Sequence, residues 1–415
     1  MQAVSRERAG MGRTLSSMPK VLVLGAGMVG SVMALDLCSD CEVVLADIRE
    51  EALSQVRETA ATRADLAPIA HRLRTVQADL SDAAAIAKLA ADCDVVAGAL
   101  SSRIGYGALR AVIEAGKPYC DISFMAEDFL ELDDLAKRAG VTCITDCGVA
   151  PGMSNILAAK GAGMLAPCER IEIYVGGLPR ERRWPFEYKA AFSPADVIEE
   201  YTRPSRMVEF GTVVTKPALS DAVLMNFDGV GTLEAFNTDG LRSLITTVGE
   251  RYAVPHMKEQ TLRYPGHIEL MRVMRETGLF SKEPILLRSA GEGPMVSVRP
   301  LDVISKLMFP KWTYGPGEED LTVMRITAQG MSGGVRRRLC WELLDYYDRE
   351  TSSTSMSRTT AFPCAIVARM LARGEFQAPG VNPPEALADQ PHLVDALLKE
   401  LRARGVTYTH SREEL

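Results

Sequence analysis

The first third of the chain alternates short apolar runs with segments of helical periodicity. Apolar runs rich in β-branched residues predict six strands, at 20–24, 42–46, 73–78, 94–100, 117–123 and 141–146. Segments with helical spacing lie between these strands at 31–37, 81–91, 106–115 and 125–139. Strands separated by helices require right-handed crossovers, so the pattern predicts an α/β fold with a doubly wound parallel sheet.

A glycine-rich turn joins the first predicted strand to the first predicted helix, in the sequence Gly25-Ala26-Gly27-Met28-Val29-Gly30. The first glycine permits a tight turn, the second lets a pyrophosphate approach the backbone, and the third lets the helix pack against the strand. The unpaired N–H groups of the helix then face the phosphates. The context predicts a Rossmann-type dinucleotide site.

Asp47 ends the second strand, 20 residues after Gly27. A carboxylate at this position can accept both ribose hydroxyls of NAD and repels the 2′-phosphate of NADP. Arg49, two residues further on, could instead bind that phosphate. The sequence therefore predicts NAD, with NADP as the alternative.

Ligands of such sheets bind beyond the carboxyl ends of the strands. Beyond the glycine turn and Asp47, the residues at those ends are Asp79, Ala99, Leu100, Ser101, Asp121 and Asp146. Asp121 and Asp146 could anchor an amine or act as a base near the nicotinamide. Aspartate is also a good N-cap, so each could simply cap the helix that follows it.

The regular alternation ends at Pro151-Gly152, which suits a hinge into another domain. Alternating strands at 171–175, 325–329 and 337–346 predict an α+β substrate domain. A helix is expected at 361–372, capped by Thr359 or Thr360, and an amphipathic helix pair at 384–405. The tail should pack back on the first domain because no core of its own is visible. The predicted division is a disordered extension (1–18), a nucleotide domain (19–148), a substrate and dimerisation domain (149–350) and a returning segment (351–415).

Composition removes several classes of function. The chain has 415 residues, 47% of them hydrophobic, and a formal net charge of −7, so nucleic acid is not the expected partner. No apolar run is long enough for a membrane span, and the first 18 residues lack the apolar core of a signal peptide. Nine scattered cysteines without a CxxC pair indicate reduced thiols of a cytoplasmic protein, and the five histidines lack metal-ligand spacing.

Three residues of the second half are further candidates for chemistry. His267 follows a tight turn and could shuttle a proton, or could be a hydrogen-bonded structural histidine. Arg242 could pair with the α-carboxylate of an amino acid, or lie on a helix surface. Tyr188 is more typical of a pocket wall than of a catalyst.

Seven segments, in this order, resemble the saccharopine dehydrogenase-like oxidoreductases, and most closely their lysine 6-dehydrogenase group. They are VLVLGAGMVG (21–30), DCGVAPGMSNIL (146–157), YVGGLP (174–179), EYKAAFSPADVIEEYTRP (187–204), LEAFNTDGLRSL (233–244), TLRYPGH (261–267) and MSRTTAFPCAIVARML (356–371). The resemblance covers about residues 20–408. Lysine 6-dehydrogenases tend to have FHT where this chain has Phe236-Asn237-Thr238, which leaves the substrate open.

The resemblance implies NAD(P)-linked oxidation of a C–N bond of an amino acid by a homodimer. Lysine at C6 is the first expectation, with saccharopine or a carboxynorspermidine-type polyamine reaction as alternatives, and a silent nucleotide-binding protein as the alternative from another class. Asp121 and His267 are the expected base candidates. The implied nucleotide contacts are the glycine loop, Asp79, Leu100, residues 121–123 and Val175. The implied substrate contacts are Leu100, Ser101, Asp121, Asn237, Thr238 and Asp239.

Overall fold

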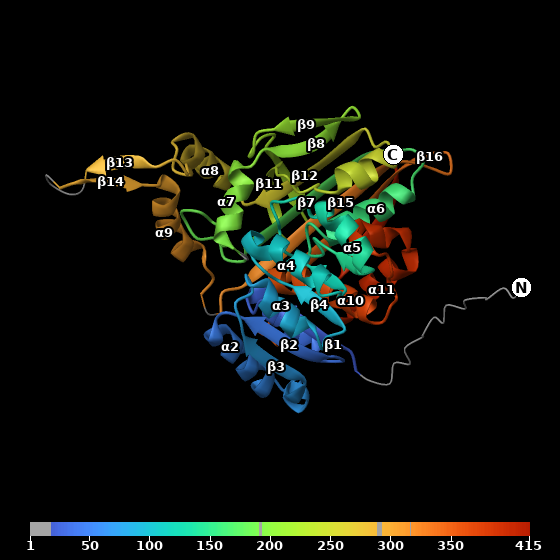
Figure 1. The fold of residues 1–415 in the computed structure, drawn as a ribbon. Coiled ribbons are helices and arrows are strands. Elements are labelled where there is room, and N and C mark those ends of the chain that lie inside the picture. Colours follow the sequence, from blue (N-terminus) through green and yellow to red (C-terminus); the bar gives the residue numbers. More distant parts are fainter. Residues whose placement is uncertain (1–17, 191–192, 289–292, 316) are drawn as a thin grey trace, which may run out of the picture.

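The computed structural model describes residues 18–190, 193–288, 293–315 and 317–415. The predicted N-terminal extension therefore lies, except for Met18, outside the described residues. Two large sheets dominate the molecule, and Figure 1 shows the amino-terminal one in blue below the second, mainly green to orange one.

The first sheet is wholly parallel and has the strand order β17-β6-β5-β4-β1-β2-β3. Its strands are β1 (Lys20–Leu24), β2 (Glu42–Asp47), β3 (Leu73–Gln77), β4 (Val95–Gly98), β5 (Tyr119–Asp121), β6 (Thr142–Ile144) and β17 (Gly380–Asn382). The side chains of β1 alternate between two apolar cores, with Val21 and Val23 in one and Leu22 and Leu24 in the other. Both faces of the sheet are therefore covered, which confirms the predicted doubly wound arrangement.

Helices follow the strands of this sheet, as the sequence predicts. They are α1 (Met28–Leu37), α2 (Glu50–Thr62), α3 (Ala83–Ala90), α4 (Ser102–Glu114) and α5 (Asp133–Ala139), with 3-10 helices at Ala67–Arg72 and Phe129–Leu132. The helix expected from residue 125 begins only at Phe129, because the Asp128 carboxylate accepts the Leu130 N–H there and caps the turn.

The second sheet is mixed and has nine strands, with β10-β11-β12-β7-β15-β16-β18 in order and β8 and β9 attached at β12. They are β7 (Cys168–Pro179), β8 (Ser205–Glu209), β9 (Thr212–Lys216), β10 (Val223–Phe227), β11 (Gly231–Asn237), β12 (His256–Arg263), β15 (Asp320–Ser332), β16 (Val335–Tyr346) and β18 (Tyr408–Glu414). Strands β12 and β7 run parallel, and the other pairs of the sheet are antiparallel. The predicted α+β character of this half is confirmed.

The helices of the second half lie around this sheet and between the two sheets (Figure 1). They are α6 (Met153–Gly163), α7 (Pro194–Thr202), α8 (His267–Glu276), α9 (Pro300–Trp312), α10 (Ser355–Ala372) and α11 (Pro391–Ala403), with a π-helix at Ile245–Glu250 and a 3-10 helix at Pro384–Asp389. None of the helices in the described ranges is long and apolar enough to cross a membrane.

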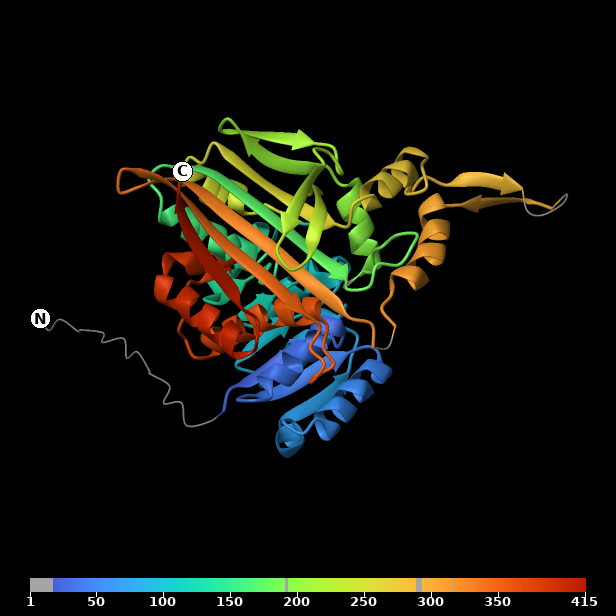
Figure 2. The ribbon, with the colours of Figure 1, turned by 180° about the vertical axis from the view of Figure 1, so that it is seen from behind.

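The C-terminal segment returns to the nucleotide-binding half, as Figure 2 shows for the red helices beside the blue strands. The buried guanidinium of Arg369 on α10 pairs with Asp36 of α1 at 2.6 Å and with Asp40 at 2.7 Å. Helix α10 begins at Ser355, six residues before the predicted start. Its cap is Thr354 rather than Thr359 or Thr360, because the Thr354 hydroxyl accepts the Ser357 N–H.

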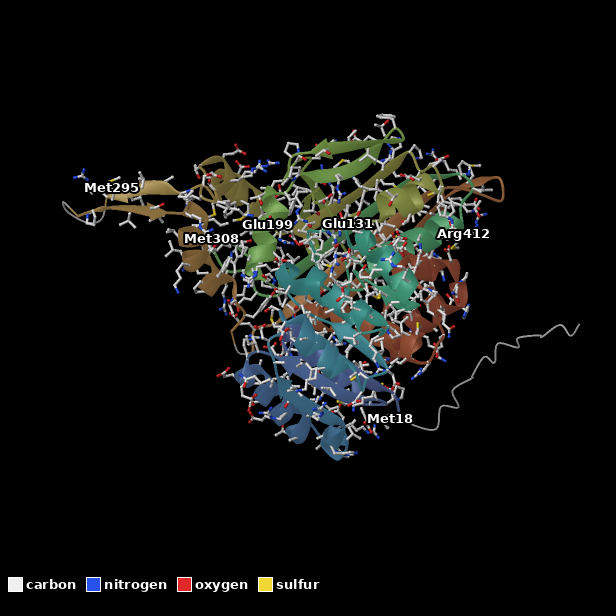
Figure 3. All side chains as sticks on the ribbon, in the orientation of Figure 1. Met18, Glu131, Glu199, Met295, Met308 and Arg412 are labelled. Carbon is white, nitrogen blue, oxygen red and sulfur yellow. The ribbon has the colours of Figure 1, made fainter. Side chains whose placement is uncertain are left out.

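A two-stranded arm projects from the second half of the molecule. Its strands are β13 (Ile285–Arg288) and β14 (Met295–Val298), which pair antiparallel with each other alone. Figure 3 shows Met295 on this arm, far from the two sheets. The apolar side chains of the arm are exposed.

Candidate functional site

A cavity of about 710 Å³ lies where the carboxyl ends of the first sheet face the second sheet. One wall comes from the glycine turn and the ends of β2 and β4. The opposite wall comes from α7, β7, β12 and the residues after β11. The cavity therefore joins the predicted nucleotide site to the second domain.

The glycine turn is built as the sequence predicts. Gly25 has a positive φ of 99°, and a Cβ there would lie 2.5 Å from the Ala99 carbonyl oxygen. A Cβ on Gly30 would lie 2.0 Å from the Gly25 carbonyl oxygen, so the helix can approach the turn only with glycine. A Cβ on Gly27 would meet nothing within 4 Å, because this position faces the cavity.

Asp47 ties the turn to β2. One carboxylate oxygen accepts the Ala26 N–H at 2.7 Å, and the other accepts the Arg49 N–H at 2.8 Å. Burial raises the pKa of Asp47, but the hydrogen bonds from the backbone of Arg49 and Ala26 outweigh this effect and lower it. The cavity wall therefore carries a fixed negative charge, with the half-exposed guanidinium of Arg49 beside it.

Most other residues expected around the cofactor also line the cavity. They are Met28, Val29, Asp79, Ala99, Leu100 and Val175, and the expected substrate contact Ser101 lies beside them. Asp79 is exposed, and hydrogen bonds from Ser81 lower its pKa. Ala26 lies behind the wall and contributes only its N–H, to Asp47.

This wall fits a dinucleotide. Gly27 leaves open space at the N-terminus of α1, where backbone N–H groups are free of helical partners and attract a phosphate. The end of β2 presents a carboxylate where a ribose lies in such folds. In the described part of the chain, no group of His, Cys, Asp and Glu side chains could hold a metal ion.

The opposite wall is rich in carboxyl groups. Its acidic residues are Asp196, Glu199, Glu200, Asp239 and Glu259, against the two arginines Arg203 and Arg263. Figure 3 places Glu199 on α7, at the side of the molecule that carries the arm. Arg263, Arg206 and Lys282 pair with Glu200, Asp239 and Glu199, so Asp196 and Glu259 are the carboxyl groups of this wall without an ion-pair partner in the described ranges and are suited to a cationic ligand.

Arg263 is buried and already fully engaged. It pairs with Glu200 at 2.9 Å, donates to the Tyr201 hydroxyl at 3.1 Å, and lies over the Tyr188 ring at 4.4 Å. Burial lowers the pKa of Arg263, but the surrounding Tyr188, Tyr201 and Glu200 raise it by more. The net pKa lies above the ordinary value of arginine, so the group stays charged. Tyr188 thus forms cavity wall, as its sequence context indicates.

Arg203 lines the cavity and forms no salt bridge with any residue in the described ranges. Its guanidinium carbon lies 5.5 Å from the centre of the Phe124 ring. Because this ring contact uses the face of the guanidinium group, the N–H groups remain available to a ligand. A planar guanidinium of this kind can bind a carboxylate through two hydrogen bonds. The group expected to do so from the sequence, Arg242, has another role.

Arg242 forms a buried ion pair with Asp146, with Nε 2.9 Å from a carboxylate oxygen. It also donates to the Met125 carbonyl oxygen at 2.9 Å. The pair fastens the second half of the molecule to the end of β6, and neither side chain reaches the cavity wall. The expectation that Arg242 and Asp146 contact substrate therefore has no support in their positions.

The two expected bases are also absent from the cavity wall. Asp121 is fully buried and accepts the Tyr119 hydroxyl at 3.2 Å. Burial, with the Asp146 carboxylate nearby, raises the pKa of Asp121 to about 7 against the hydrogen bonds from Ser123. Its neighbour Ile122 is the residue that faces the cavity.

His267 is a structural histidine in this fold. Its Nδ1 donates to the Phe186 carbonyl oxygen, so its Nε2 accepts from the Tyr201 hydroxyl, each at 2.9 Å. Burial and the charge of Arg263 lower the pKa of His267 to about 3. It cannot take up a proton near neutral pH, and it does not line the cavity.

The segment after β11 divides between the two environments. Thr238 and Asp239 line the cavity, and Asp239 binds Arg206 at 2.9 Å. Asn237 points the other way and donates to Ser220 and Asp221. Two of the three residues expected from the sequence to contact the substrate, Thr238 and Asp239, therefore line the cavity.

Sequence reasoning missed Glu259, Glu200 and Arg203. Each lies inside one of the motifs or next to it, but on a strand or helix whose orientation toward the cavity depends on distant pairing. Glu259 stands opposite Ile173 in the β12–β7 register, and no local pattern reveals that partner. The one available signal for Glu259 was the alternation of side chains between the two faces of a strand at 256–263.

A parallel sheet with the order 3-2-1-4-5-6, a glycine turn and a carboxylate after β2 define a dinucleotide-dependent oxidoreductase fold with a second, mixed-sheet domain. Comparison with known families agrees. Residues 21–144 match the saccharopine dehydrogenase NADP binding domain, and residues 148–406 match the saccharopine dehydrogenase C-terminal domain. The chain belongs to the saccharopine dehydrogenase family, and its cofactor is NAD(P).

Curated relatives are distant. The mitochondrial alpha-aminoadipic semialdehyde synthase of Bos taurus is 24% identical, over 95% of this chain and 48% of its own length. The chain thus spans about half the length of that relative. Saccharopine dehydrogenase [NADP(+), L-glutamate-forming] of Schizosaccharomyces pombe is 22% identical over 79% of this chain and 87% of its own. Carboxynorspermidine synthase of Vibrio cholerae is 23% identical over 90% and 93%.

Solved structures share the fold. Apo saccharopine dehydrogenase (L-Glu forming) from Saccharomyces cerevisiae superposes with a TM-score of 0.75 at 18% identity, over 95% of this chain and 100% of that one. A homospermidine synthase from Legionella pneumophila, in complex with NAD, gives 0.60 at 11% identity, over 95% and 91%.

Proposed function

We propose that this protein is an amino-acid dehydrogenase that oxidises a C–N bond of a substrate with a second amine, with lysine at C6 as the first candidate. One observation carries this proposal: the cavity joins the dinucleotide wall to a wall with five carboxyl groups and the unpaired Arg203. A zwitterion with an additional ammonium group matches that distribution of charge.

The cofactor half of the proposal uses the cavity wall around the glycine turn. The residues that would hold the dinucleotide are Gly25, Gly27, Met28, Val29, Gly30, Asp47, Asp79, Ala99, Leu100 and Val175, with Ala26 bracing Asp47. When bound, the nicotinamide accepts a hydride from the carbon that bears the amine. The protein's own residues position the substrate and handle its proton.

The substrate half assigns the carboxylate to Arg203 and the amine to the acidic residues. Ser101, Thr238 and Asp239 line the space between the two walls. Arg263 is unavailable to substrate as a charge, because Glu200 already compensates it. Saccharopine carries several carboxylates, whereas Arg203 is the one arginine of this wall that has no carboxyl partner in the described ranges, which favours lysine over saccharopine.

A polyamine reaction of the carboxynorspermidine type is the second candidate. The acidic wall suits a diamine as well as lysine, and a relative with that name matches most of the chain. The two candidates differ at Arg203, since a diamine has no carboxylate for it to bind.

The test is a screen for reduction of NAD and NADP with lysine, ornithine, saccharopine and diamines, followed by the reverse reaction with putrescine. We expect turnover with lysine. Arg203→Ala should raise KM for lysine by about tenfold or more, in line with a charge-assisted contact, and leave a diamine unaffected. Turnover of diamines alone would establish the polyamine reaction. If none of these amines supports reduction of NAD or NADP, the result would favour a silent nucleotide-binding protein.

We also propose that the protein works as a homodimer. The exposed apolar side chains of the β13–β14 arm support this assembly, because a two-stranded hairpin is marginally stable when it stands alone in water.

A further inference from the structure

Glu259 on β12 is a carboxyl group that lines the cavity. The residue is 5% exposed, and its Oε2 atom is buried and makes no hydrogen bond with any residue that the structure describes. Gly240 faces it so closely that a Cβ at that position would lie 1.8 Å from Oε1. Glycine at 240 therefore leaves the room that this carboxyl group occupies.

The other carboxyl groups around Glu259 are already compensated. Glu200 on α7 pairs with Arg263, and Asp239 after β11 pairs with Arg206. Arg242, the nearest opposite charge from that segment, pairs with Asp146. A buried polar atom without a partner is costly, so it marks a position where a ligand completes the hydrogen bonding.

The electrostatic surroundings make this carboxyl group able to exchange a proton near neutral pH. Burial raises the pKa of Glu259 to about 8, the charges of Glu200 and Asp239 raise it as well, and Arg242 opposes them. A general base is most effective when its pKa lies near the working pH.

Building on the proposed function, we propose that Glu259 binds the reacting ammonium group of the substrate and accepts its proton before the C–H bond breaks. The N–H bond breaks, its proton passes to a Glu259 carboxylate oxygen, and the electron pair stays on nitrogen. A neutral amine and a carboxylic acid result. Only the neutral amine has the lone pair that stabilises the developing C=N bond.

The first experiment compares wild type with Glu259→Gln, which keeps the size of the side chain and cannot accept the proton. We expect kcat with lysine to fall by about 10²–10⁴-fold, the usual contribution of a general base. The decline of kcat/KM toward low pH that Glu259 causes should disappear, and NADH affinity should stay near that of wild type.

The matched control is Glu172→Gln on the neighbouring strand β7. Glu172 pairs with Arg170 and Lys258 and does not line the cavity. Its replacement should leave kcat and the pH profile unchanged.

A binding experiment separates this inference from the proposed function. Lysine is titrated calorimetrically, in two buffers of different ionisation enthalpy, into protein loaded with NADH. Wild type should release a proton, because a bound ammonium group lowers the pKa of Glu259, and Glu259→Gln should release none and bind more weakly.

The outcomes are distinct. If wild type neither binds nor oxidises any amine, the proposed function fails and takes this inference with it. If wild type binds and oxidises lysine while Glu259→Gln keeps its turnover, pH profile and proton release, the function stands and the inference is overturned.

Discussion

Glu259 is one of the buried carboxyl groups that make the stability of this protein depend on pH. The pKa of Glu259 is raised from 4.5 to about 8 in the fold, so the unfolded chain ionises first as pH rises. The favourable contribution of Glu259 is therefore complete below about pH 4.5 and is lost as pH rises to about 8. Glu259→Gln removes this dependence.

We expect wild type and Glu259→Gln to unfold at similar temperatures near pH 5, and the variant to be more stable by several degrees near pH 9. Calorimetric melting curves of the two proteins at both pH values measure this difference. Equal melting temperatures at about pH 9 would mean that Glu259 is not held neutral by the fold.

Asp47 and Arg49 make a second prediction at the level of single residues. The fixed charge of Asp47 should repel a 2′-phosphate, so NAD should bind more tightly than NADP, by about tenfold or 1.4 kcal/mol. Fluorescence titrations with NADH and NADPH give the two constants.

Arg49→Ala is the informative variant, because the Arg49 side chain is exposed and its removal should not disturb the glycine turn. NADH affinity should stay near wild type. A wild-type preference for NADP that Arg49→Ala abolishes would show that Arg49, rather than Asp47, selects the cofactor. Asp47→Ala is less clean, since it also frees the Ala26 N–H.

The contrast between His267 and Glu259 explains what single residues reveal in a sequence. His267 follows a turn motif and attracts attention, yet Phe186 and Tyr201 from distant segments hold both its ring nitrogens. Glu259 lies in an unremarkable strand and gains its environment from α7 and the loop after β11. Both environments come from long-range contacts, which local sequence does not encode.

Among the elements, the glycine turn was predictable because its requirements are local. Its residues, the preceding strand and the following helix are contiguous, and the space at each glycine follows from the turn itself. The doubly wound parallel arrangement of the first sheet was also predictable, because right-handed crossovers between alternating strands and helices leave few arrangements. Strand β17 was missed because only three residues, far along the chain, form it.

Gly27→Val tests the glycine turn. A Cβ at this position meets nothing within 4 Å in the protein, and the position faces the cavity, so the fold should survive while NADH affinity falls by about 100-fold or more. Fluorescence titration gives the affinity and circular dichroism checks the fold.

Gly107→Val is the matched control, since Gly107 on α4 also has open space at its Cβ position and lies outside the cavity wall. Its NADH affinity should equal that of wild type. A Gly27→Val protein that binds NADH normally would place the dinucleotide elsewhere.

At the scale of the whole molecule, the projecting arm leads to a prediction about assembly. Leu286 is 67% exposed on β13, and Ile285, Leu287, Met295 and Val296 are exposed around it. We expect wild type to have the mass of a dimer by light scattering, and Leu286→Glu to shift it toward the monomer.

Thermal stability of the isolated variant should change little, because the side chain contacts no core of its own chain. Thr215→Glu on β9 is a comparable added charge on another exposed strand and should keep the wild-type mass. If wild type is a monomer at micromolar concentration, or if Leu286→Glu dimerises with wild-type affinity, the arm is not part of a dimer interface.

The order in which the ribosome makes this chain conflicts with the order in which its first sheet is completed. Strand β17 closes the sheet beside β6, and α10 is clamped to α1 through Arg369, yet both are synthesised long after β6 and α1. Until then β6 has an open edge with unpaired N–H and carbonyl groups, and one face of α1 is bare. A nascent chain that has already produced the entire dinucleotide motif should therefore remain dependent on chaperones until residues 355–382 have emerged.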